Sequence, residues 1–216
     1  MDVGVMKPIA TGGRVIAHGR MRHLVSDDAI RLARAAGSHD PWDLVNPICL
    51  KEPLAPWTAA MRAHRVISLT TVMQAARALL RRHEIVIVEG IGGLLVPLTA
   101  RLTVADLARR MGFPLLLVAR ARLGTLNHTL LSLQCAQAKG LRTVGVILNH
   151  AEPPGRERMS QVAQRSNPRI LRRLVPTPVA GPLPFRPHLA HSRLAQWLES
   201  SVGRPWMARL ITALSS

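Results

Sequence analysis

Cysteine is scarce in this sequence of 216 residues, which contains only Cys49 and Cys135. Two cysteines cannot supply the disulfide framework of a small secreted domain, and their scarcity favours a reducing cytoplasm. No apolar run reaches the roughly 20 residues that a membrane-spanning helix needs. No basic-then-apolar signal segment opens the chain. We therefore expect a soluble, cytoplasmic protein with no membrane partner.

Acidic residues are also few, since 12 aspartates and glutamates face 29 lysines and arginines and the formal net charge is +17. Such a charge suits binding to phosphate backbones, but the arginines are scattered over many segments and lysine occurs only at positions 7, 51 and 139. The absence of tyrosine and the presence of just two phenylalanines leave few stacking platforms for single strands. The pattern favours solvated helix faces over a nucleic-acid partner. The basic surface would still attract an anionic ligand such as a nucleotide.

Hydrophobic residues make up 48% of the chain, which is enough for one sizeable core and predicts a single domain over residues 1–216. Short apolar runs alternate with helical patterns, and this alternation predicts an α/β fold in which helices flank both faces of a parallel sheet. The predicted strands cover residues 3–10, 85–89, 115–119, 143–149 and 178–183. The predicted helices cover residues 27–36, 70–82, 104–111, 126–139, 155–164, 191–199 and 206–214.

Residues 39–56 form a long connection that contains four prolines and the run NPICLKEPLAP. Connections of this length are usually functional or disordered. This one has too many apolar residues for a disordered segment, so we predict an ordered and functional loop.

The stretch IVIVEGIGGLLVPL, residues 85–98, ends the most hydrophobic predicted strand in a carboxylate and a glycine-rich turn. One interpretation is structural: Gly90, Gly92 and Gly93 supply positive φ angles, and Glu89 is the first solvated residue. The other is a ligand site, because ligands bind at the carboxyl ends of parallel strands. There a carboxylate can hold a metal, and glycines let a ligand approach the backbone. This stretch alone favours neither interpretation.

Other polar residues lie at predicted strand ends and helix starts. Lys7 is either an edge residue whose stem reaches water or a buried cation that needs a charged partner such as a phosphate. Asp28 follows Ser26 at a helix start, where capping alone would explain it. Asn149 could serve a turn or read a base edge, and the helix start at residues 124–127 offers N–H groups to an anion. Their convergence on one predicted sheet edge indicates a binding site.

Several motifs follow one another along the chain: VMKPIATG, SDDA, NPICLKEPLAP, VEGIGGLLVPL, RARLGTLNHTLLS, GVILN and GPLP. In order and spacing they resemble the landmarks of the dethiobiotin synthetase family, from the first residues to about Phe185. The resemblance implies a P-loop-type α/β fold, a homodimer, and an ATP-dependent ligase of biotin biosynthesis with Mg²⁺ as its cofactor. It also implies 7,8-diaminopelargonate, CO₂ and ATP as substrates, from which the ureido ring of dethiobiotin is formed.

The same resemblance assigns roles to single residues. It implies that Asp28 and Glu89 bind Mg²⁺ at the nucleotide, and that Lys7 is catalytic and faces the phosphates and the carbamate. It implies substrate contacts at Thr11, Gly124, Thr125, Leu126 and Asn127, the last four of which would receive the substrate carboxylate from the neighbouring subunit. It implies further nucleotide or carbamate contacts at Gly90, Gly92, Gly93, Asn149, Pro184, Phe185 and Arg186.

One landmark of the family is missing from the sequence. The family opens with a strand and a phosphate loop of the GxxxxGKT kind, and this sequence contains no such motif. Met1 falls where the family's second strand begins, so we expect one β-loop-α unit of about 30 residues to be absent. Two hypotheses follow. The chain belongs either to a dethiobiotin synthetase that starts upstream of Met1, or to a truncated, non-catalytic homologue or basic accessory protein.

Overall fold

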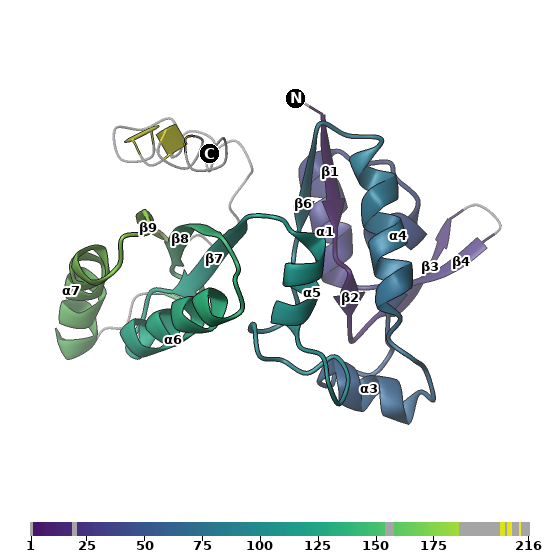
Figure 1. Cartoon of the computed structure of the whole chain (residues 1–216), viewed down its shortest axis with the longest axis horizontal. Coiled ribbons are helices and arrows are strands. Elements are labelled where there is room, and N and C mark those ends of the chain that lie inside the picture. Colours follow the sequence, from purple (N-terminus) through teal and green to yellow (C-terminus); the bar gives the residue numbers. More distant parts are fainter. Residues whose placement is uncertain are drawn as a thin grey trace. The chain divides into compact units, whose positions relative to one another are not determined.

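The computed structural model describes residues 2–18, 21–153 and 158–185, together with residues 204, 205, 207, 208 and 212. The chain divides into two compact units, Met1–Met111 and Gly112–Ser216 (Figure 1). The single domain predicted from composition stays a prediction. The helix predicted at residues 191–199 lies outside the described residues, and only positions 207, 208 and 212 of the last predicted helix are described, all of them helical.

The first unit is built around a parallel strand pair. β1 (Val3–Met6) pairs in parallel with β6 (Ile85–Val88), so that Met6 lies opposite Val88. The predicted strand 85–89 is thereby confirmed. The predicted strand 3–10 is interrupted, because Pro8 has no N–H to donate to a neighbouring strand. Parallel pairing brings the carboxyl ends of β1 and β6 to one place, and that is where the polar residues of the motifs follow.

Two smaller sheets complete the strands of this unit. β2 (Ile9–Ala10) pairs in parallel with β5 (Ile48–Cys49). β3 (Arg14–His18) and β4 (Met21–Val25) form an antiparallel hairpin. The sequence did not predict this hairpin, because its strands are short, basic and largely exposed and therefore lack a clear apolar alternation.

The helices of the first unit are α1 (Asp27–Ala36), α2 (Trp42–Val45), α3 (Pro56–Arg62), α4 (Leu69–Leu80) and α5 (Val104–Met111). The predicted helices 27–36 and 104–111 are confirmed at both ends, and 70–82 is confirmed within two residues. The ends of α1 could be predicted because both carry capping residues. The Ser26 hydroxyl accepts a hydrogen bond from the Ala29 N–H at 3.1 Å, and Gly37 ends the helix with a φ of 61°.

The larger core of the first unit lies between the strands and α4. Val72 and Leu79 of α4 are fully buried, and they belong to one cluster with Met6, Leu50 and Leu98. A smaller cluster joins α1 to β1 through Ala29, Ile30 and Val5, among others. These contacts hold α1, β1 and β6 in fixed relative positions, which fixes any side chains that project from their ends.

The connection over residues 39–56 is ordered, as predicted. It contains α2 and β5, and its residues Val45, Ile48 and Leu50 are buried. The Arg65 guanidinium donates to the Cys49 carbonyl oxygen at 3.2 Å, which adds a side-chain contact to the main-chain pairing. The segment is therefore part of the core of this unit.

The second unit is a three-stranded parallel sheet in the order β7-β8-β9. Its strands are β7 (Leu115–Arg120), β8 (Thr143–Asn149) and β9 (Val179–Leu183), with helices α6 (Thr125–Ala138) and α7 (Arg158–Leu174) between them. The predicted strands at these positions are confirmed, as is the helix predicted at 126–139. Parallel strands joined by helices confirm the predicted α/β class.

The helix predicted at residues 155–164 was wrong in extent. α7 runs from Arg158 to Leu174 and contains Pro168, and residues 154–157 lie outside the described part of the chain. An interior proline removes a helical hydrogen bond, which is why the pattern was expected to stop before it. Burial of Asn167, Pro168 and Leu171 on one face of α7 outweighs that cost.

One face of β6 and of β7 carries exposed apolar side chains. Ile85 and Ile87 of β6 are 41% and 53% exposed, and Leu116 and Val118 of β7 are 38% and 62% exposed. The expected cover of both sheet faces is therefore not seen at these strands. In the described part of the chain, no helix is long and apolar enough to cross a membrane.

His83 joins three segments of the first unit at the start of β1 and β6. Its Nδ1 lies 2.9 Å from Asp2 Oδ1, and its Nε2 lies 2.8 Å from Asp40 Oδ2. Hydrogen bonding to Asp2 raises the pKa of His83, burial opposes the rise, and Asp40 adds to it. Burial opposes the lowering of the Asp40 pKa, but hydrogen bonds from Ser38, Arg82 and His83 hold that pKa below its usual value.

These two shifts predict a pH dependence of stability. A raised pKa in the folded state means that the contribution of His83 is complete below its unfolded pKa of about 6.5 and is lost as the pH rises through the folded pKa. The contribution of Asp40 to the free energy of unfolding is constant in that range, because the lowered pKa of Asp40 means that this contribution is lost only under acidic conditions. We expect urea unfolding to show a larger loss of stability between about pH 5.5 and pH 8.5 in the wild type than in His83→Gln. Equal losses in both proteins would contradict this role.

Candidate functional site

Lys7 lies at the centre of a polar cluster at the carboxyl ends of β1 and β6. Its Nζ donates to Glu89 Oε1 at 2.8 Å and to the Gly90 carbonyl oxygen at 3.0 Å, and lies 3.0 Å from Asp28 Oδ2. The Lys7 side chain is 4% exposed, whereas those of Asp28 and Glu89 are 52% and 47% exposed. The ammonium group is thus enclosed, while both carboxylates keep a face toward solvent.

This geometry decides between the two interpretations of Lys7. An edge lysine would extend its ammonium into water, but here the ammonium is buried with charged partners. An ammonium has three N–H donors, and Asp28, Glu89 and the Gly90 carbonyl provide one acceptor each, so its burial is compensated. Two carboxylates against one ammonium leave the cluster with one net negative charge, which favours the approach of a further cation.

Main-chain hydrogen bonds fix the positions of Lys7 and Glu89, and a helix start positions Asp28. The Lys7 N–H donates to the Val45 carbonyl oxygen at 2.7 Å, and the Glu89 N–H donates to the Met6 carbonyl oxygen at 2.8 Å. Asp28 stands in the first turn of α1, where its negative charge also complements the helix dipole. Capping alone therefore does not explain Asp28, because its carboxylate also reaches Lys7.

Asn46 is a positioning residue that sequence reasoning missed. Its Nδ2 donates to the Lys7 carbonyl oxygen at 2.8 Å, and its Oδ1 accepts from the Ser26 N–H at 3.1 Å. The residue is 5% exposed. It connects the backbone of Lys7 to the start of α1, which carries Asp28. The sequence signal for Asn46 is the Asn-Pro pair at the start of NPICLKEPLAP. That run is one of the family landmarks, but the resemblance assigned no role to Asn46.

We expect Asn46→Ala to lower the free energy of unfolding by about 1 to 3 kcal/mol, because it leaves a buried N–H and a buried carbonyl without their partners. Chemical denaturation of the purified protein measures this. Asn127→Ala is a suitable control, since Asn127 is exposed on α6 and should change stability by less than about 0.5 kcal/mol. A cost for Asn46→Ala no larger than that of the control would show that Asn46 does not hold the cluster together.

The glycine turn after β6 differs from its predicted role. Gly92 has a φ of 62°, and an added Cβ there would lie 2.8 Å from Val96 Cγ2. Gly90 and Gly93 do not have positive φ, so the interpretation in which all three glycines supply it was wrong. Gly90 instead accepts from Lys7 through its carbonyl oxygen. Gly93 has open space around its Cβ position, which leaves that part of the backbone accessible.

Thr11 lies in the turn that follows β2. This turn is joined to the 39–56 segment, because the Gly12 N–H donates to the Glu52 carbonyl oxygen at 3.2 Å and the Gly13 N–H donates to the Leu50 carbonyl oxygen at 3.0 Å. Gly12 adopts a φ of 70°, a conformation that suits glycine. The turn is therefore well defined, and the substrate contact of Thr11 stays a prediction.

The remaining predicted residues belong to the second unit. Gly124 precedes α6 with a φ of 89°. Thr125 is buried: its N–H donates to the Arg122 carbonyl oxygen at 3.0 Å, and its hydroxyl lies 3.4 Å from that of Thr129. Leu126 and Asn127 follow in the first turn of the helix, where Asn127 is exposed. The Thr125 hydroxyl is buried, so an anion at this helix start would meet the N–H groups of the first turn and the exposed side chain of Asn127.

Asn149 ends β8 and lies opposite Leu183 of β9. The His150 N–H donates to the Leu183 carbonyl oxygen at 3.0 Å, so the two strand ends are joined directly before Pro184 and Phe185. Arg186 lies outside the described residues. The structure therefore brings Asn149 close to Pro184 within this unit.

A metal at the Lys7 cluster would have few protein ligands. Among the described residues, no group of three or more histidines, cysteines, aspartates or glutamates could hold a metal ion. Asp28 and Glu89 alone therefore supply carboxylate oxygens at this place. That number suits Mg²⁺, which is commonly bound by one or two carboxylates and keeps water or phosphate oxygens as its other ligands.

A family model described as an AAA domain matches residues 1–193 of the chain. The matched region includes the first unit, the second unit up to residue 193, and every predicted site residue. With the parallel strands and flanking helices, it places the chain in the P-loop NTPase-like class of α/β proteins and confirms the predicted fold class.

The chain belongs to the dethiobiotin synthetase family within that class. It is similar to ATP-dependent dethiobiotin synthetases of Anaeromyxobacter dehalogenans (45% identity over 71% of this chain and 65% of the relative) and Thermodesulfovibrio yellowstonii (33% identity over 91% and 81%). The synthetase of Bacillus velezensis is 33% identical over 93% of this chain and 81% of the relative. The chain thus spans just under two thirds of the Anaeromyxobacter dehalogenans relative and about four fifths of the other two.

Proposed function

We propose that this chain acts in ATP-dependent dethiobiotin synthesis, closing the ureido ring of dethiobiotin from 7,8-diaminopelargonate, CO₂ and ATP. The observation that carries the proposal is the enclosed Lys7 ammonium between the two half-exposed carboxylates of Asp28 and Glu89. It lies at the carboxyl ends of parallel strands, the usual ligand position in such sheets. The membership of the family supplies the reaction.

Asp28 and Glu89 would hold Mg²⁺ in this proposal. Their carboxylates converge on one point, since both lie within 3.0 Å of the same Lys7 Nζ. Each side chain is about half exposed, so a hydrated cation can reach them. When bound, Mg²⁺ would neutralise negative charge on the nucleotide phosphates.

Lys7 would stabilise negative charge at the reacting groups. In the proposed reaction, a carbamate formed from CO₂ on one amine attacks the γ-phosphate of ATP and releases ADP. The second amine then attacks the resulting mixed anhydride, releases phosphate and closes the ring. Lys7 is fixed by its backbone and by three polar contacts, and its ammonium would exchange one of these contacts for a phosphate or carbamate oxygen to serve these steps. Holding both amines on one substrate supplies proximity.

The substrate carboxylate would bind at the start of α6 in this proposal. The N–H groups of Leu126 and Asn127 in the first turn suit an anion, and Gly124 allows a ligand close to the backbone. In a homodimer this helix start would serve the neighbouring subunit, and Asn149, Pro184 and Phe185 would contact the adenine.

A cytoplasmic location is supported by two cysteines that are both free thiols.

The second candidate function is non-catalytic binding as a homologue of the synthetases. This sequence contains no GxxxxGKT motif. A phosphate loop supplies a row of backbone N–H donors and a lysine to the triphosphate. The two functions are separated by adding the β-loop-α unit of a homologous synthetase at the N-terminus and measuring dethiobiotin formation. A folded protein that then binds ATP but forms no dethiobiotin would reject the first proposal.

The proposed homodimer predicts complementation between two inactive variants. In the extended protein, Glu89→Gln and Asn127→Ala should each lower activity, but their mixture should recover part of it. The reason is that a hybrid dimer contains one site in which neither lesion is present. Dethiobiotin formation by the mixed proteins measures the recovery, and each variant mixed with itself is the control. No recovery, with heterodimers shown to form, would mean that each site is built within one subunit.

A further inference from the structure

A cavity of about 1120 Å³ lies along α7 and β9 in the second unit. It is far larger than a water site and is comparable to the cavities that hold small organic ligands. Its lining is formed by His150, Val162, Gln164, Arg165, Ser166, Pro168, Arg169, Ile170, Arg172, Arg173 and Pro182. None of these described residues is an aspartate or a glutamate, so the charged side chains among them are all basic.

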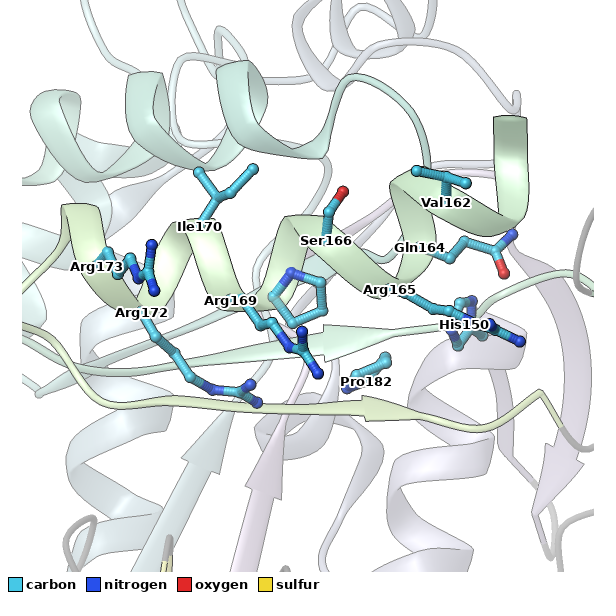
Figure 2. A pocket seen from close by; sticks show the side chains of 11 residues that line it. His150, Val162, Gln164, Arg165, Ser166, Arg169, Ile170, Arg172, Arg173 and Pro182 are labelled. Atoms are coloured by element: carbon cyan, nitrogen blue, oxygen red, sulfur yellow. The ribbon is translucent and has the colours of Figure 1, made fainter. Parts of the chain in front are cut away.

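The arginines of the cavity follow helical spacing. Arg165, Arg169 and Arg172 are separated by four and three positions, which places them along one side of α7. Figure 2 shows Arg169 and Arg172 directed toward β9 and Arg165 directed toward His150, with Pro182 on the same side of the helix. Ile170 is drawn on the opposite side of the helix. The guanidinium groups therefore share one groove between α7 and β9.

Arg172 is held in place by the main chain of β9. Its Nε donates to the Val179 carbonyl oxygen at 3.2 Å, and its Nη2 donates to the Gly181 carbonyl oxygen at 2.7 Å. These bonds fix one cation at the floor of the groove without neutralising it. A guanidinium has five N–H donors, so Arg172 retains donors for a ligand.

Arg165 and Arg169 have no ion pair with any carboxylate in the described part of the chain. Like charges four residues apart on a helix repel one another. Repulsion of this kind is relieved when an anion binds between the guanidinium groups. The groove thus combines a fixed cation at Arg172 with two further cations that have no counter-charge among the described residues.

We propose that the groove between α7 and β9 binds a small anion that carries two or more linked phosphate groups. Several guanidinium groups at helical spacing match successive phosphates, since each guanidinium can bind phosphate oxygens through two parallel N–H bonds. Among the described residues, the lining contains no phenylalanine, tyrosine or tryptophan on which the bases of a nucleic acid could stack. None of the described lining residues is a predicted site residue, but His150 directly follows Asn149 and Pro182 lies two positions before Pro184, so the groove adjoins the predicted adenine contacts in the sequence.

Calorimetric titration of the full chain with inorganic tripolyphosphate tests this site. We expect Arg165→Gln/Arg169→Gln to weaken binding at least about tenfold. Arg77→Gln/Arg81→Gln is the matched control, because it removes two exposed arginines with the same spacing at the end of α4. The control should change affinity by less than about twofold at moderate ionic strength.

Two outcomes would overturn the proposal. Equal weakening in both double variants would mean that the probe responds only to net charge, and undetectable binding by the wild type would mean that there is no site. A parallel titration with ADP distinguishes the source of the phosphates. If the wild type binds ADP more tightly than tripolyphosphate and the groove variant loses ADP binding, the ligand is a nucleotide. If the wild type binds tripolyphosphate more tightly than ADP, the ligand is a bare polyphosphate. The readout is binding, so it does not depend on whether the chain forms dethiobiotin.

Discussion

Glu89→Gln should lower kcat/KM for dethiobiotin formation at least about 100-fold in the protein extended by a phosphate loop, while its fold stays intact. Glu89 supplies one of the two carboxylates at the Lys7 cluster, and glutamine replaces an anionic metal ligand with a neutral amide of the same size. The loss of Mg²⁺ binding should then cost several kcal/mol of transition-state stabilisation. Steady-state kinetics at several Mg²⁺ concentrations, with far-ultraviolet circular dichroism of the same samples, measures both parts of the expectation.

Glu84→Gln is the control for this experiment. Glu84 directly precedes β6 and Glu89 directly follows it, so both substitutions remove one carboxylate from the ends of the same strand. Glu84 is exposed, and its Oε2 accepts from the Asp2 N–H at a distance of 3.5 Å, which is too long for a strong contact. We expect near-normal kinetics for Glu84→Gln. Near-normal activity of Glu89→Gln at saturating Mg²⁺ would remove Glu89 from the metal site.

The sequence predicted the regular elements best where local signals and burial agree. β8 was predicted at both ends, because its seven residues are mostly buried and read as a continuous apolar run. α1 was predicted at both ends through its Ser26 and Gly37 caps. α7 was predicted too short, because Pro168 is a local stop signal and the burial that overrides it comes from tertiary packing.

The Lys7 cluster was predictable in composition but not in geometry. The sequence placed Lys7, Asp28 and Glu89 at strand or helix ends, and the parallel pairing of β1 with β6 then brings two of them together. No sequence pattern indicated that the ammonium is enclosed by the carboxylates of the chain itself. Nor could it show that Asn46 bridges Lys7 and Ser26, because that contact joins positions 39 and 20 residues apart through a loop without periodicity.

The second prediction of large effect concerns the nucleotide. The Lys7 cluster of the chain by itself should bind ATP weakly or not at all, because Lys7, Asp28 and Glu89 provide one cation and two anions but no row of backbone N–H donors for a triphosphate. Its Lys7 ammonium is also already occupied by three acceptors. ATP titration calorimetry of the Arg165→Gln/Arg169→Gln variant in the presence of Mg²⁺ measures this, because that variant weakens the proposed groove between α7 and β9. Micromolar affinity would show that the triphosphate binds elsewhere in the chain.

Adding the β-loop-α unit of a homologous synthetase at the N-terminus should change both ATP affinity and stability. The added loop supplies the missing N–H donors and lysine, so ATP affinity should rise by at least about 100-fold. The added strand can pair with the second edge of β6, because among the described residues β6 pairs only with β1. The exposed side chains of Ile85 and Ile87 on β6 are apolar surface that the added unit can cover. The midpoint of thermal unfolding should therefore rise as well, since new ladder hydrogen bonds form and apolar surface is buried.

A fusion in which the GKT lysine of the added loop is alanine separates the two effects: it should keep the gain in stability and lose most of the gain in affinity. If that variant still binds ATP as tightly as the intact fusion, the loop does not hold the triphosphate, and the nucleotide site proposed beside Asp28 and Glu89 is wrong.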